Sequence, residues 1–564
     1  MSLFRARVLT PLFCLCTWLG CGALWKPFGY SDPNNCAPNP AICGAGFECN
    51  FQREVCEPSA TLPTVSRPQW KQQAKLEASD GAALNSLGYS VSIFADTVLV
   101  GAHQASVTGV GTADGAAYVF VRDPDRRVWT QQAKLTTSDA ATADYVGFSV
   151  SLFGDTALLS AHNSDPGGLA QAGAAYVFVR RSSEGQTVWT QQAKLVANDR
   201  LAGDLFSSSV SLYADTALLG AHLVDSGSFI NSGAAYVFLR TPATGVWTQQ
   251  SPRLVPSDAA DDDIFGRAVS LSADTAVIGA AQADPGGKSD AGAAYVFGRD
   301  AQSGAFTQRA KLVAADGTAG DGFGSAVAVS GDTAVVGAPN ADPGGTTNAG
   351  AAYVFGRNPQ SGVWTQQAKL VANDGAPGAV FGSAVALSGD YMAIAAPAAA
   401  VNGQAGAGAV YVFTRAPGQG TWTLEARLGA ADAGRSDTAG YGVALSGETL
   451  VLGASGKDRG GDPDVGAAYV FQRAKPSGDP CISGHECHST FCADGVCCDS
   501  ACGGSDPSDC QACSAAAGAP ISSDGDGICR PRRAGKLCRP STDAADPPES
   551  CDGQLLTCPP DVHG

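Results

Sequence analysis

The chain lacks cysteine throughout its middle: none of its 19 cysteines lies between Cys56 and Cys481. Charged residues are also scarce, at 16% of the 564 residues, against about 25% in ordinary domains. Hydrophobic residues reach 44%, so the chain does not have the low hydrophobicity and high charge of a disordered protein. A cysteine-free middle of this length must rely on a buried apolar core.

Positive charge is in the minority, with 36 Lys and Arg against 53 Asp and Glu and a formal net charge of −17. Nucleic-acid affinity depends mainly on Lys and Arg that neutralise phosphates. We therefore expect no nucleic acid among the partners. Beyond the N-terminal run described next, no stretch reaches 18 apolar residues, so no transmembrane helix is expected.

The first 20 residues have the pattern of an export signal. Two arginines, Arg5 and Arg7, precede an uncharged run at residues 8–19. The run ends in Trp-Leu-Gly-Cys, which resembles a bacterial lipobox with Trp18 at a position that is usually aliphatic. The resemblance implies that Cys21 is acylated, and ordinary cleavage after Ala23 stays open as the alternative. The protein is therefore expected to be exported, as a cell-envelope lipoprotein or a secreted protein, with a lipid on Cys21 as its only membrane contact.

Cysteine-dense segments flank the middle, and both retain even numbers of cysteines once the signal and Cys21 are set aside. Even counts in an exported protein favour disulfides, which short segments need as covalent staples. The expected disulfide cysteines are Cys36, Cys43, Cys49, Cys56, Cys481, Cys487, Cys492, Cys497, Cys498, Cys502, Cys510, Cys513, Cys529, Cys538, Cys551 and Cys558. A zinc site at Cys510 and Cys513 with nearby histidines is the weaker alternative, because a second Cys pair is missing. The segment at 36–56 resembles an EGF-like knot and the segment at 549–562 a disintegrin-like one, which implies extracellular protein contact.

The middle of the chain is a sevenfold repeat. An aromatic residue opens Trp-Thr-Gln-Gln-Ala-Lys-Leu, or a close variant, every 58 to 60 residues. The seven copies start at Trp70, Trp129, Trp189, Trp247, Phe306, Trp364 and Trp422. A second landmark, Gly-Ala-Ala-Tyr-Val-Phe, also occurs seven times and ends at Phe120, Phe178, Phe238, Phe297, Phe355, Phe413 and Phe471.

One unit contains four extended segments and no helical periodicity. Trp364–Leu370 alternates apolar and polar residues, as a strand with one wet face does. Phe381–Leu387, Met392–Ala396 and Val410–Phe413 are nearly all small, aliphatic or aromatic, as in strands buried on both faces. Four short strands repeated seven times predict an all-β fold, a seven-bladed β-propeller of four-stranded blades, flanked by small disulfide-rich modules.

These motifs resemble the FG-GAP repeat of the integrin α-subunit propeller. Phe-Gly at 265–266, 323–324 and 381–382, Gly-Ala-Pro at 337–339 and the Tyr-Val-Phe strand carry the resemblance over residues 70–473. In that family several blades hold calcium in an Asp-rich loop after the first strand. Here each such loop is a short hairpin with one acid: Asp96, Asp155, Asp215, Asp274, Asp332, Asp390 and Glu448.

A single carboxylate cannot provide the six to eight oxygen ligands of calcium. We therefore expect these acids to form turns, since Asp tolerates the left-handed backbone, and we expect no cofactor. The predicted organisation is a signal at 1–20, a Cys-rich segment at 21–57, a linker at 58–69, the propeller at 70–473, a linker at 474–480 and disulfide modules at 481–564. No Trp-to-Leu strand follows Phe471, so Trp70–Leu76 should complete the seventh blade beside Val465–Phe471 and cover its edge.

Strand order places the acid turns on one rim of the propeller and the long loops on the other. The long loops carry a repeated aspartate: Asp80, Asp139, Asp199, Asp258, Asp316, Asp374 and Asp432. Further acids there are Asp165, Asp225, Asp284 and Asp342. The fourth blade departs from the rest with Asp261, Asp262 and Asp263, close to Asp258, Asp284 and Lys288. This group is the candidate binding site for a cation or a basic partner, and the alternative is that each Asp caps its own loop.

Three histidines, His103, His162 and His222, occupy one equivalent position in consecutive blades. A metal site would need them within the short reach of one ion, which equivalent positions of neighbouring blades do not provide. Hydrogen bonding within the loops is the expected role.

No catalytic constellation stands out from the repeat. A Gly-x-Ser-x-Gly elbow in a strand-turn-helix context and a phosphate-binding loop are both missing, and no acid pair is distinctive. The expected function is therefore non-catalytic binding of an extracellular protein or glycan, in adhesion or envelope scaffolding. A secreted enzyme that acts on polysaccharide through rim carboxylates and a structural envelope component remain the alternatives.

Overall fold

A computed structural model describes residues 69–107, 113–123, 128–183, 186–416 and 420–474, together with four short strand pairs outside this range. Residues 69–474 form one compact unit. The outlying pairs are β1 (Phe47–Asn50) with β2 (Val55–Pro58), β31 (Phe491–Ala493) with β32 (Val496–Cys498), β33 (Gln511–Ala512) with β34 (Arg530–Pro531) and β35 (Leu537–Arg539) with β36 (Glu549–Ser550). The register places Cys49 opposite Cys56 and Cys492 opposite Cys497. The signal, Cys21 and the expected disulfides otherwise lie outside the described residues and stay predictions.

The unit at 69–474 is a seven-bladed β-propeller of four-stranded antiparallel blades, as predicted. Blade 1 consists of β4 (Ser90–Phe94), β5 (Thr97–Ala102), β6 (Ala116–Arg122) and β7 (Trp129–Leu135). Blade 2 consists of β8 (Val150–Phe153), β9 (Thr156–Ala161), β10 (Ala174–Ser183) and β11 (Gln186–Leu195), and blade 3 of β12 (Ser209–Tyr213), β13 (Thr216–Ala221), β14 (Ala234–Arg240) and β15 (Trp247–Gln249). Blade 4 consists of β16 (Ala268–Ser272), β17 (Thr275–Ala280), β18 (Ala293–Arg299) and β19 (Phe306–Leu312), and blade 5 of β20 (Ala326–Ser330), β21 (Thr333–Ala338), β22 (Ala351–Arg357) and β23 (Trp364–Leu370). Blade 6 consists of β24 (Val385–Ser388), β25 (Tyr391–Ala396), β26 (Ala409–Arg415) and β27 (Trp422–Leu428).

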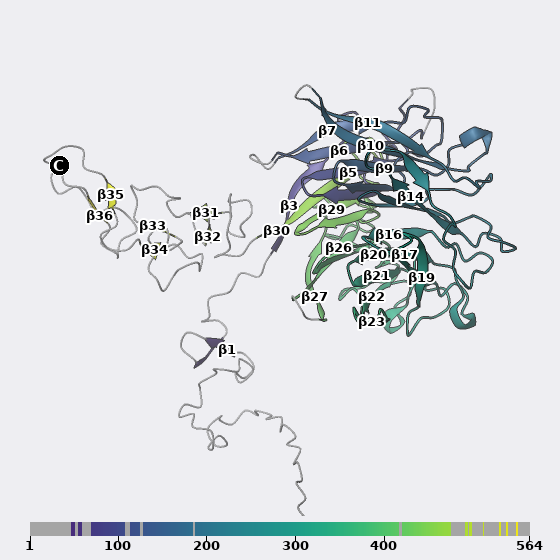
Figure 1. The fold of residues 1–564 in the computed structure, drawn as a ribbon. Coiled ribbons are helices and arrows are strands. Elements are labelled where there is room, and N and C mark those ends of the chain that lie inside the picture. The colour runs from purple at the N-terminus through teal and green to yellow at the C-terminus, as the bar shows by residue number, and fades with distance from the viewer. Residues whose placement is uncertain are drawn as a thin grey trace, which may run out of the picture. The chain divides into compact units, whose positions relative to one another are not determined.

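Blade 7 joins the two ends of the propeller. It consists of β28 (Val443–Ser446), β29 (Thr449–Ala454), β30 (Ala467–Ala474) and β3 (Gln69–Leu76), the first strand of the unit. β3 pairs antiparallel with β30, with Gln72 opposite Phe471 and Leu76 opposite Ala468. Figure 1 shows the purple β3 beside the yellow-green β30. The predicted closure is confirmed, and it covers an edge that would otherwise be open.

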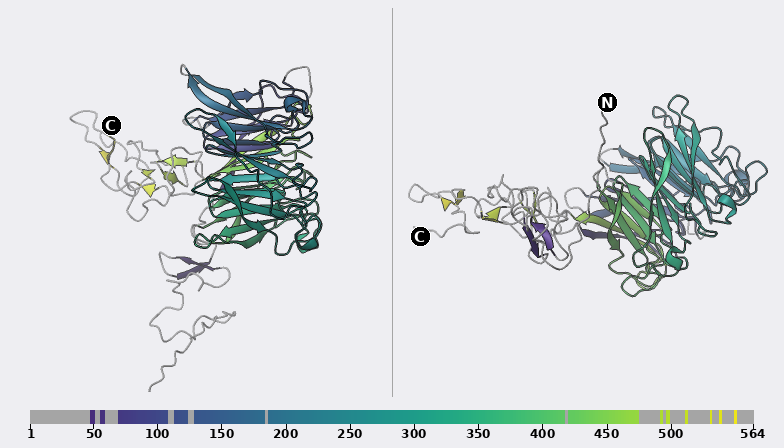
Figure 2. Two further views of the ribbon diagram at one scale, coloured as in Figure 1. Left: turned by 45° about the vertical axis from the view of Figure 1, so that its right-hand side comes forward. Right: turned by 90° about the horizontal axis from the view of Figure 1, so that it is seen from below.

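The core lies between neighbouring blades. The second strand of each blade is almost entirely buried, as in β5, β9, β13, β17, β21 and β29. Small side chains in these strands let the sheets pack closely face to face, and Figure 2 shows the blades packed in this way with loops on both sides. Two apolar clusters illustrate this packing, since each contains residues of adjacent blades.

The Phe-Gly motif lies before the innermost strand rather than within it. The sequence suggested a strand from Phe381, but β24 begins at Val385. Phe381 is fully buried and packs edge-on to Tyr411 at 5.3 Å. Gly382 has φ +94°, a conformation that favours glycine. A Cβ added at Gly337 of the preceding blade would lie only 1.9 Å from the carbonyl oxygen of Gly382. The two glycines of the motif are therefore required by one close contact between blades.

The described residues contain no α-helix, and three short 3₁₀ turns lie at Pro166–Gly168, Pro285–Gly287 and Pro343–Gly345. Within the part of the chain that the structure describes, no helix has the length and apolar character needed to cross a membrane.

Candidate functional site

We call the side of the propeller that carries the long loops the loop rim. Its repeated aspartates form ion pairs with a Lys or Arg of the blade that each loop enters. The cation lies in the outer strand, except in blade 3, where Arg253 follows β15. The pairs are Asp80–Lys134 (2.6 Å), Asp139–Lys194 (2.6 Å), Asp199–Arg253 (2.7 Å), Asp258–Lys311 (2.5 Å), Asp316–Lys369 (2.6 Å), Asp374–Arg427 (2.8 Å) and Asp432–Lys75 (3.0 Å). These seven carboxylates are therefore not a free acidic surface. Asp80, Asp139, Asp258 and Asp316 also accept a hydrogen bond from their own backbone N–H, so loop capping is confirmed in part for these four, whereas the ion pairs were not predicted.

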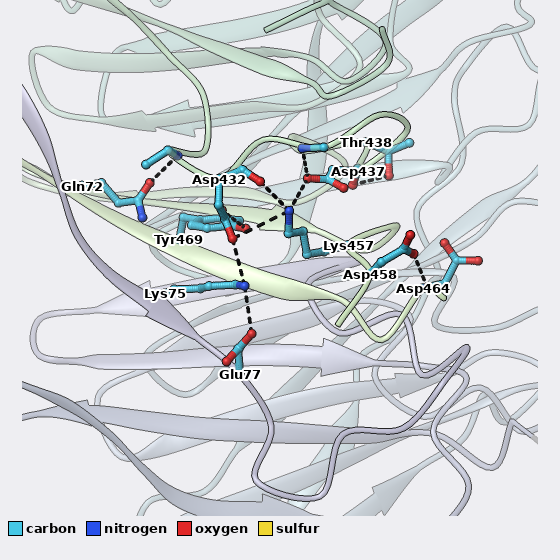
Figure 3. A network of polar contacts seen from close by, with 12 residues as sticks. Gln72, Lys75, Glu77, Asp432, Asp437, Thr438, Lys457, Asp458, Asp464 and Tyr469 are labelled. Atoms are coloured by element: carbon cyan, nitrogen blue, oxygen red, sulfur yellow. Dashed lines mark hydrogen bonds and ion pairs between the residues drawn. The ribbon is translucent and has the colours of Figure 1, made fainter. Parts of the chain in front are cut away.

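The pair in blade 7 belongs to the ring closure. Lys75 of β3 contacts Glu77 at 2.9 Å and Asp432 at 3.0 Å. Asp432 also accepts a hydrogen bond from Tyr469 Oη (2.7 Å), and Figure 3 shows this network. Lys457 lies 3.0 Å from Asp437. Positive charge therefore surrounds the repeated aspartate at the one place where the two ends of the propeller meet.

The acids of the fourth-blade cluster are exposed except for Asp263, but each of them is bound to a neighbouring group. Asp258 pairs with Lys311. Burial alone would raise the pKa of Asp258, but hydrogen bonds from Lys311 and Tyr295 outweigh it and hold that pKa below its ordinary value. Asp263 is only 4% exposed and accepts the backbone N–H of Ala260 at 2.7 Å, and burial raises its pKa.

The other candidate acids of this blade are bound within the loops. Asp261 accepts the N–H of Ile230 (2.8 Å), and Asp262 accepts from Asn231 Nδ2 (2.9 Å). Asp284 accepts the N–H of Asp290 (2.8 Å). Lys288 donates to the carbonyl of Gly317 (2.6 Å) and not to the acid cluster. Loop capping, the alternative interpretation, is thus confirmed for Asp284, and also for Asp165, Asp225 and Asp342, which accept the N–H six residues later.

On the opposite side, which we call the turn rim, the acid of the hairpin binds an arginine side chain in every blade except blade 4, where Arg299 Nε donates to the carbonyl of Gly304 instead. In blade 5, Arg357 Nε donates to Asp332 at 2.5 Å, and the Asp332 carbonyl accepts the N–H of Arg357. The left-handed residue is Gly331, which precedes the acid, so the expectation that the acid itself adopts this conformation was wrong. In blade 3, Arg240 binds Asp215 and also reaches Thr156 of blade 2 at 3.1 Å, so these acids anchor arginines that link blades.

Metal-binding groups are not assembled in the described part of the propeller. No three His, Cys, Asp or Glu side chains of these residues converge in a way that could hold an ion. A cleft on the loop rim of about 420 Å³ is lined by Asp139, Asp144 and Asp165. Lys194 pairs with Asp139, and backbone N–H groups occupy one oxygen of each of the other two carboxylates.

The loop rim breaks the sevenfold repeat at its centre, at the residue that follows the Phe-Gly position and leads into the innermost strand. This position holds Phe-Gly in blades 4 to 6, and Leu87-Gly88, Val146-Gly147, Phe206-Ser207 and Ala439-Gly440 in blades 1, 2, 3 and 7. We call the seven residues that directly follow it the axial mouth. In blades 1 to 7 they are Tyr89, Phe148, Ser208, Arg267, Ser325, Ser383 and Tyr441. Tyr89 stacks on Tyr441 (5.8 Å between ring centroids, 14° between planes) and contacts Phe148 (5.0 Å). Aromatic rings from three consecutive blades are therefore in contact.

Two of the three histidines, His103 and His162, pack against these rings, and His222 contacts Ser208. His103 lies 4.3 Å from Tyr89 and His162 4.2 Å from Phe148, measured between ring centroids. His222 Nδ1 is 2.8 Å from Ser208 Oγ, whereas Nδ1 of His103 and of His162 are buried without a hydrogen-bond partner among the described residues. Loop hydrogen bonding, the expected role, is thus confirmed for His222 alone. Burial lowers the pKa of all three histidines from 6.5 to about 4.

Arg267 is the only cation of the axial mouth. It is exposed and has no carboxylate partner among the described residues. Burial raises the pKa of Tyr89, and the positive charge of Arg267 opposes that rise although the two residues are three blades apart. The same charge contributes to the lowered pKa values of His162 and His222. Arg267 therefore acts electrostatically on three other blades, which is consistent with a place near the propeller axis.

At the turn rim the innermost strands end in a second asymmetric arc. Phe153 contacts both Phe94 and Tyr213, at 4.8 Å in each case. The later blades have serine at this position, as in Ser388, which accepts the N–H of Gly447 at 3.0 Å. This arc carries no charged residue of its own, so the axial mouth of the loop rim is the better candidate site.

Sequence reasoning missed the axial mouth because it searched for acids. The signal was present in the position after Phe-Gly, which is aromatic in blades 7, 1 and 2 and basic in blade 4. Comparing each repeat position across the blades would have found it.

Comparisons with known proteins agree with this architecture. The family model for the FG-GAP repeat matches residues 70–120, 129–178, 189–238, 247–297, 306–355, 364–413 and 422–471, which is more than half of the chain. A search of curated proteins finds no match. Each matched segment runs from the outer strand of one blade, through the linking loop and the Phe-Gly position, to the third strand of the next blade. On this repeated match, the chain belongs to the FG-GAP repeat family.

Proposed function

We propose that this protein is a non-catalytic binding protein of the cell surface or the extracellular space, which binds a protein or glycan at the axial mouth. The observation that carries the proposal is the asymmetry of this position. Elsewhere on the loop rim the repeated groups pair with one another, whereas the axial mouth presents Tyr441, 51% exposed, and the unpaired Arg267. Exposed aromatic and Arg side chains are the types most enriched at binding hot spots.

The pairing of the rim carboxylates favours binding over polysaccharide hydrolysis. A glycosidase needs one protonated acid and a second free carboxylate. Asp80, Asp139, Asp258, Asp316 and Asp432 have lowered pKa values, since hydrogen bonds to Lys and Tyr outweigh the effect of burial. Such groups stay ionised and bound, so they are poor general acids.

Export and membrane attachment are the second part of the proposal. They rest on the signal-like residues 1–20, the lipobox-like Cys21 and the even cysteine counts of the two ends. Adhesion and envelope scaffolding both fit a propeller that is held at the surface by an N-terminal lipid. Fractionation of cells that express the wild type or Cys21→Ser tests this part, since acylation requires the thiol.

The binding proposal is tested by a screen of glycans and cell-surface proteins against the full chain, with and without a chelator. Ligands from the screen are then measured against Tyr441→Ala and Arg267→Ala. We expect at least tenfold weaker binding in one of these variants. Full binding by both variants would move the binding site away from the axial mouth.

A further inference from the structure

The axial mouth combines three kinds of side chain in one ring of seven positions. Aromatic rings lie in blades 7, 1 and 2, the cation Arg267 lies in blade 4, and hydroxyls lie in blades 3, 5 and 6. Because a repeat supplies seven equivalent positions, a distribution of this kind is not required by the architecture. A ligand that fits it must offer a negative group at one edge, an apolar face and several hydroxyl groups.

The cation sets the charge of the ligand. The seven Lys and Arg side chains that pair with the repeated aspartates of the loop rim are neutralised, but Arg267 is exposed and unpaired among the described residues. A guanidinium binds a carboxylate in a bidentate manner. A cationic ligand would be repelled by Arg267 and would meet no free carboxylate in the axial mouth.

The aromatic rings set the shape of the ligand. Tyr441 is half exposed and stacked on Tyr89, and Tyr89 is held in turn by His103 and Phe148. Rings fixed in this way lose little freedom when a flat apolar face packs on them, and their polar edges remain available.

The serines add acceptors for hydroxyl groups. Ser325 Oγ donates to the carbonyl of Gly322 and Ser383 Oγ to that of Val380, both at 2.7 Å. Each hydroxyl oxygen therefore keeps lone pairs for a hydrogen from a ligand. Ser208 is buried against His222 and serves that ring instead.

A peptide strand fits the mouth less well than a sugar. Serines of the preceding blades already accept edge N–H groups of the innermost strands, as Ser92 does for Leu152 (3.0 Å) and Ser151 for Leu212 (2.9 Å). The same arrangement links β12 to β16 and β16 to β20. A peptide that binds by strand addition needs free main-chain N–H and C=O groups. Few such groups remain free along the innermost strands of these blades.

We infer that the axial mouth binds an acidic sugar residue of a glycan, with its carboxylate on Arg267, its ring against Tyr441 and Tyr89, and its hydroxyls toward Ser325 and Ser383. This inference rests on the proposed binding function and narrows it to carboxylated carbohydrate.

The test uses the full chain and two matched probes in titration calorimetry. One probe is a hexamer of galacturonic acid, and the other is the same hexamer with its carboxyl groups reduced to alcohols. We expect the acidic hexamer to bind and the reduced hexamer to bind at least tenfold more weakly. Arg267→Gln should weaken binding of the acidic hexamer at least tenfold and abolish the preference, whereas Tyr441→Ala should weaken both probes.

Arg435→Gln is the control, because Arg435 is an exposed arginine on the same rim in the loop that leads into blade 7. It should leave binding unchanged, and melting curves should show that all the variants fold.

Equal binding of the two hexamers, no binding of the acidic one at millimolar concentration, or equal losses in Arg267→Gln and Arg435→Gln would overturn the inference. In that case a protein or neutral glycan from the screen whose binding is weakened by Tyr441→Ala would still support the proposed function, although the inference about an acidic sugar had failed. Insensitivity of every ligand to both axial variants would overturn the proposed function as well.

Discussion

Buried aspartates recur at one position of the loop rim, five residues after the exposed aspartate that binds Lys or Arg. Asp144, Asp204, Asp263, Asp321 and Asp437 are 3–6% exposed. Each accepts the backbone N–H three residues before it, at 2.6–2.9 Å. The Asp261–Asp263 run of the fourth blade therefore contains one architectural residue and two exposed ones.

Replacing Asp263 by Ala should lower the free energy of unfolding by about 1–3 kcal/mol, because the partly buried hydrogen bond from the N–H of Ala260 to a charged acceptor is lost. Asp262→Asn should change it by less than about 0.5 kcal/mol, since the exposed amide keeps an oxygen for Asn231. Urea denaturation of both variants measures the difference. Equal stability of the two variants would show that the buried hydrogen bond contributes nothing.

The buried histidines predict a loss of stability in acid. The pKa of His103 is about 4 in the folded protein, against an ordinary value of 6.5, because burial disfavours the charged form. The unfolded chain therefore takes up a proton between these values while the folded chain does not. The contribution of His103 is complete above pH 6.5 and is lost as the pH falls toward 4.

His103→Phe keeps an aromatic ring beside Tyr89 and Phe148 but removes this titration. From pH 7 to pH 4, the stability of the wild type should fall by about 2–3 kcal/mol relative to this variant. Chemical denaturation at several pH values measures the change, and the titrations of all the carboxylates cancel in the difference. Phe323→Leu is the control, since Phe323 is a fully buried ring that packs on Tyr353 and Phe355, and its difference from the wild type should not vary with pH over this range. A constant difference for His103→Phe would contradict the assignment.

At the scale of the element, the closing strand β3 has the largest consequence. β3 pairs with β30 along its length and buries Trp70 and Leu76, which are 8% and 2% exposed. Its Lys75 also binds Asp432, so the strand closes the ring through both its backbone and its side chains (Figure 3).

Deletion of residues 60–77 should therefore lower the melting temperature sharply. Burial of each of the two large side chains contributes about 1.5–3 kcal/mol, and the edge of β30 becomes open. Deletion of residues 22–57 removes a longer segment but keeps β3, and it should leave the melting of the propeller unchanged. Scanning calorimetry of the two chains distinguishes them, and equal melting temperatures would contradict the role of β3.

Most of the blade pattern could be predicted from sequence, because the strands repeat with fixed landmarks and one face of each is buried. The start of the innermost strand could not, because Phe381-Gly382 reads as extended until the close contact with Gly337 is seen. The partners of the repeated aspartates were missed for a related reason. Asp258 and Lys311 are 53 residues apart in sequence, and only the ring places the outer strand beside the loop that leads into its blade.

At the scale of the whole molecule, the stabilising contacts recur from blade to blade, whereas the residues at the centre of the loop rim differ between blades. The Asp–cation pairs occur in all seven blades and the buried aspartates in five of them, so they stabilise the loops between blades and do not distinguish a ligand. The axial mouth was not predicted, because its residues come from all seven blades and no short sequence window contains them. Its asymmetry is the feature that a repeat architecture does not need for its own stability.

The distribution of cysteine predicts that oxidation state and propeller stability are independent. The unit at 69–474 contains no cysteine, and twelve cysteines lie from Cys481 to Cys558 without interruption by another long cysteine-free domain. Mature protein from an oxidising compartment should show no free thiol on alkylation, apart from an acylated Cys21 that is blocked. A reductant should expose thiols between Cys481 and Cys558, detected as mass shifts, while the main melting transition stays at the same temperature, because no covalent bond within the propeller is broken. A melting transition that moves with the concentration of reductant would show that the Cys-rich ends stabilise the propeller, and free thiols before reduction would favour the metal-binding alternative at Cys510 and Cys513.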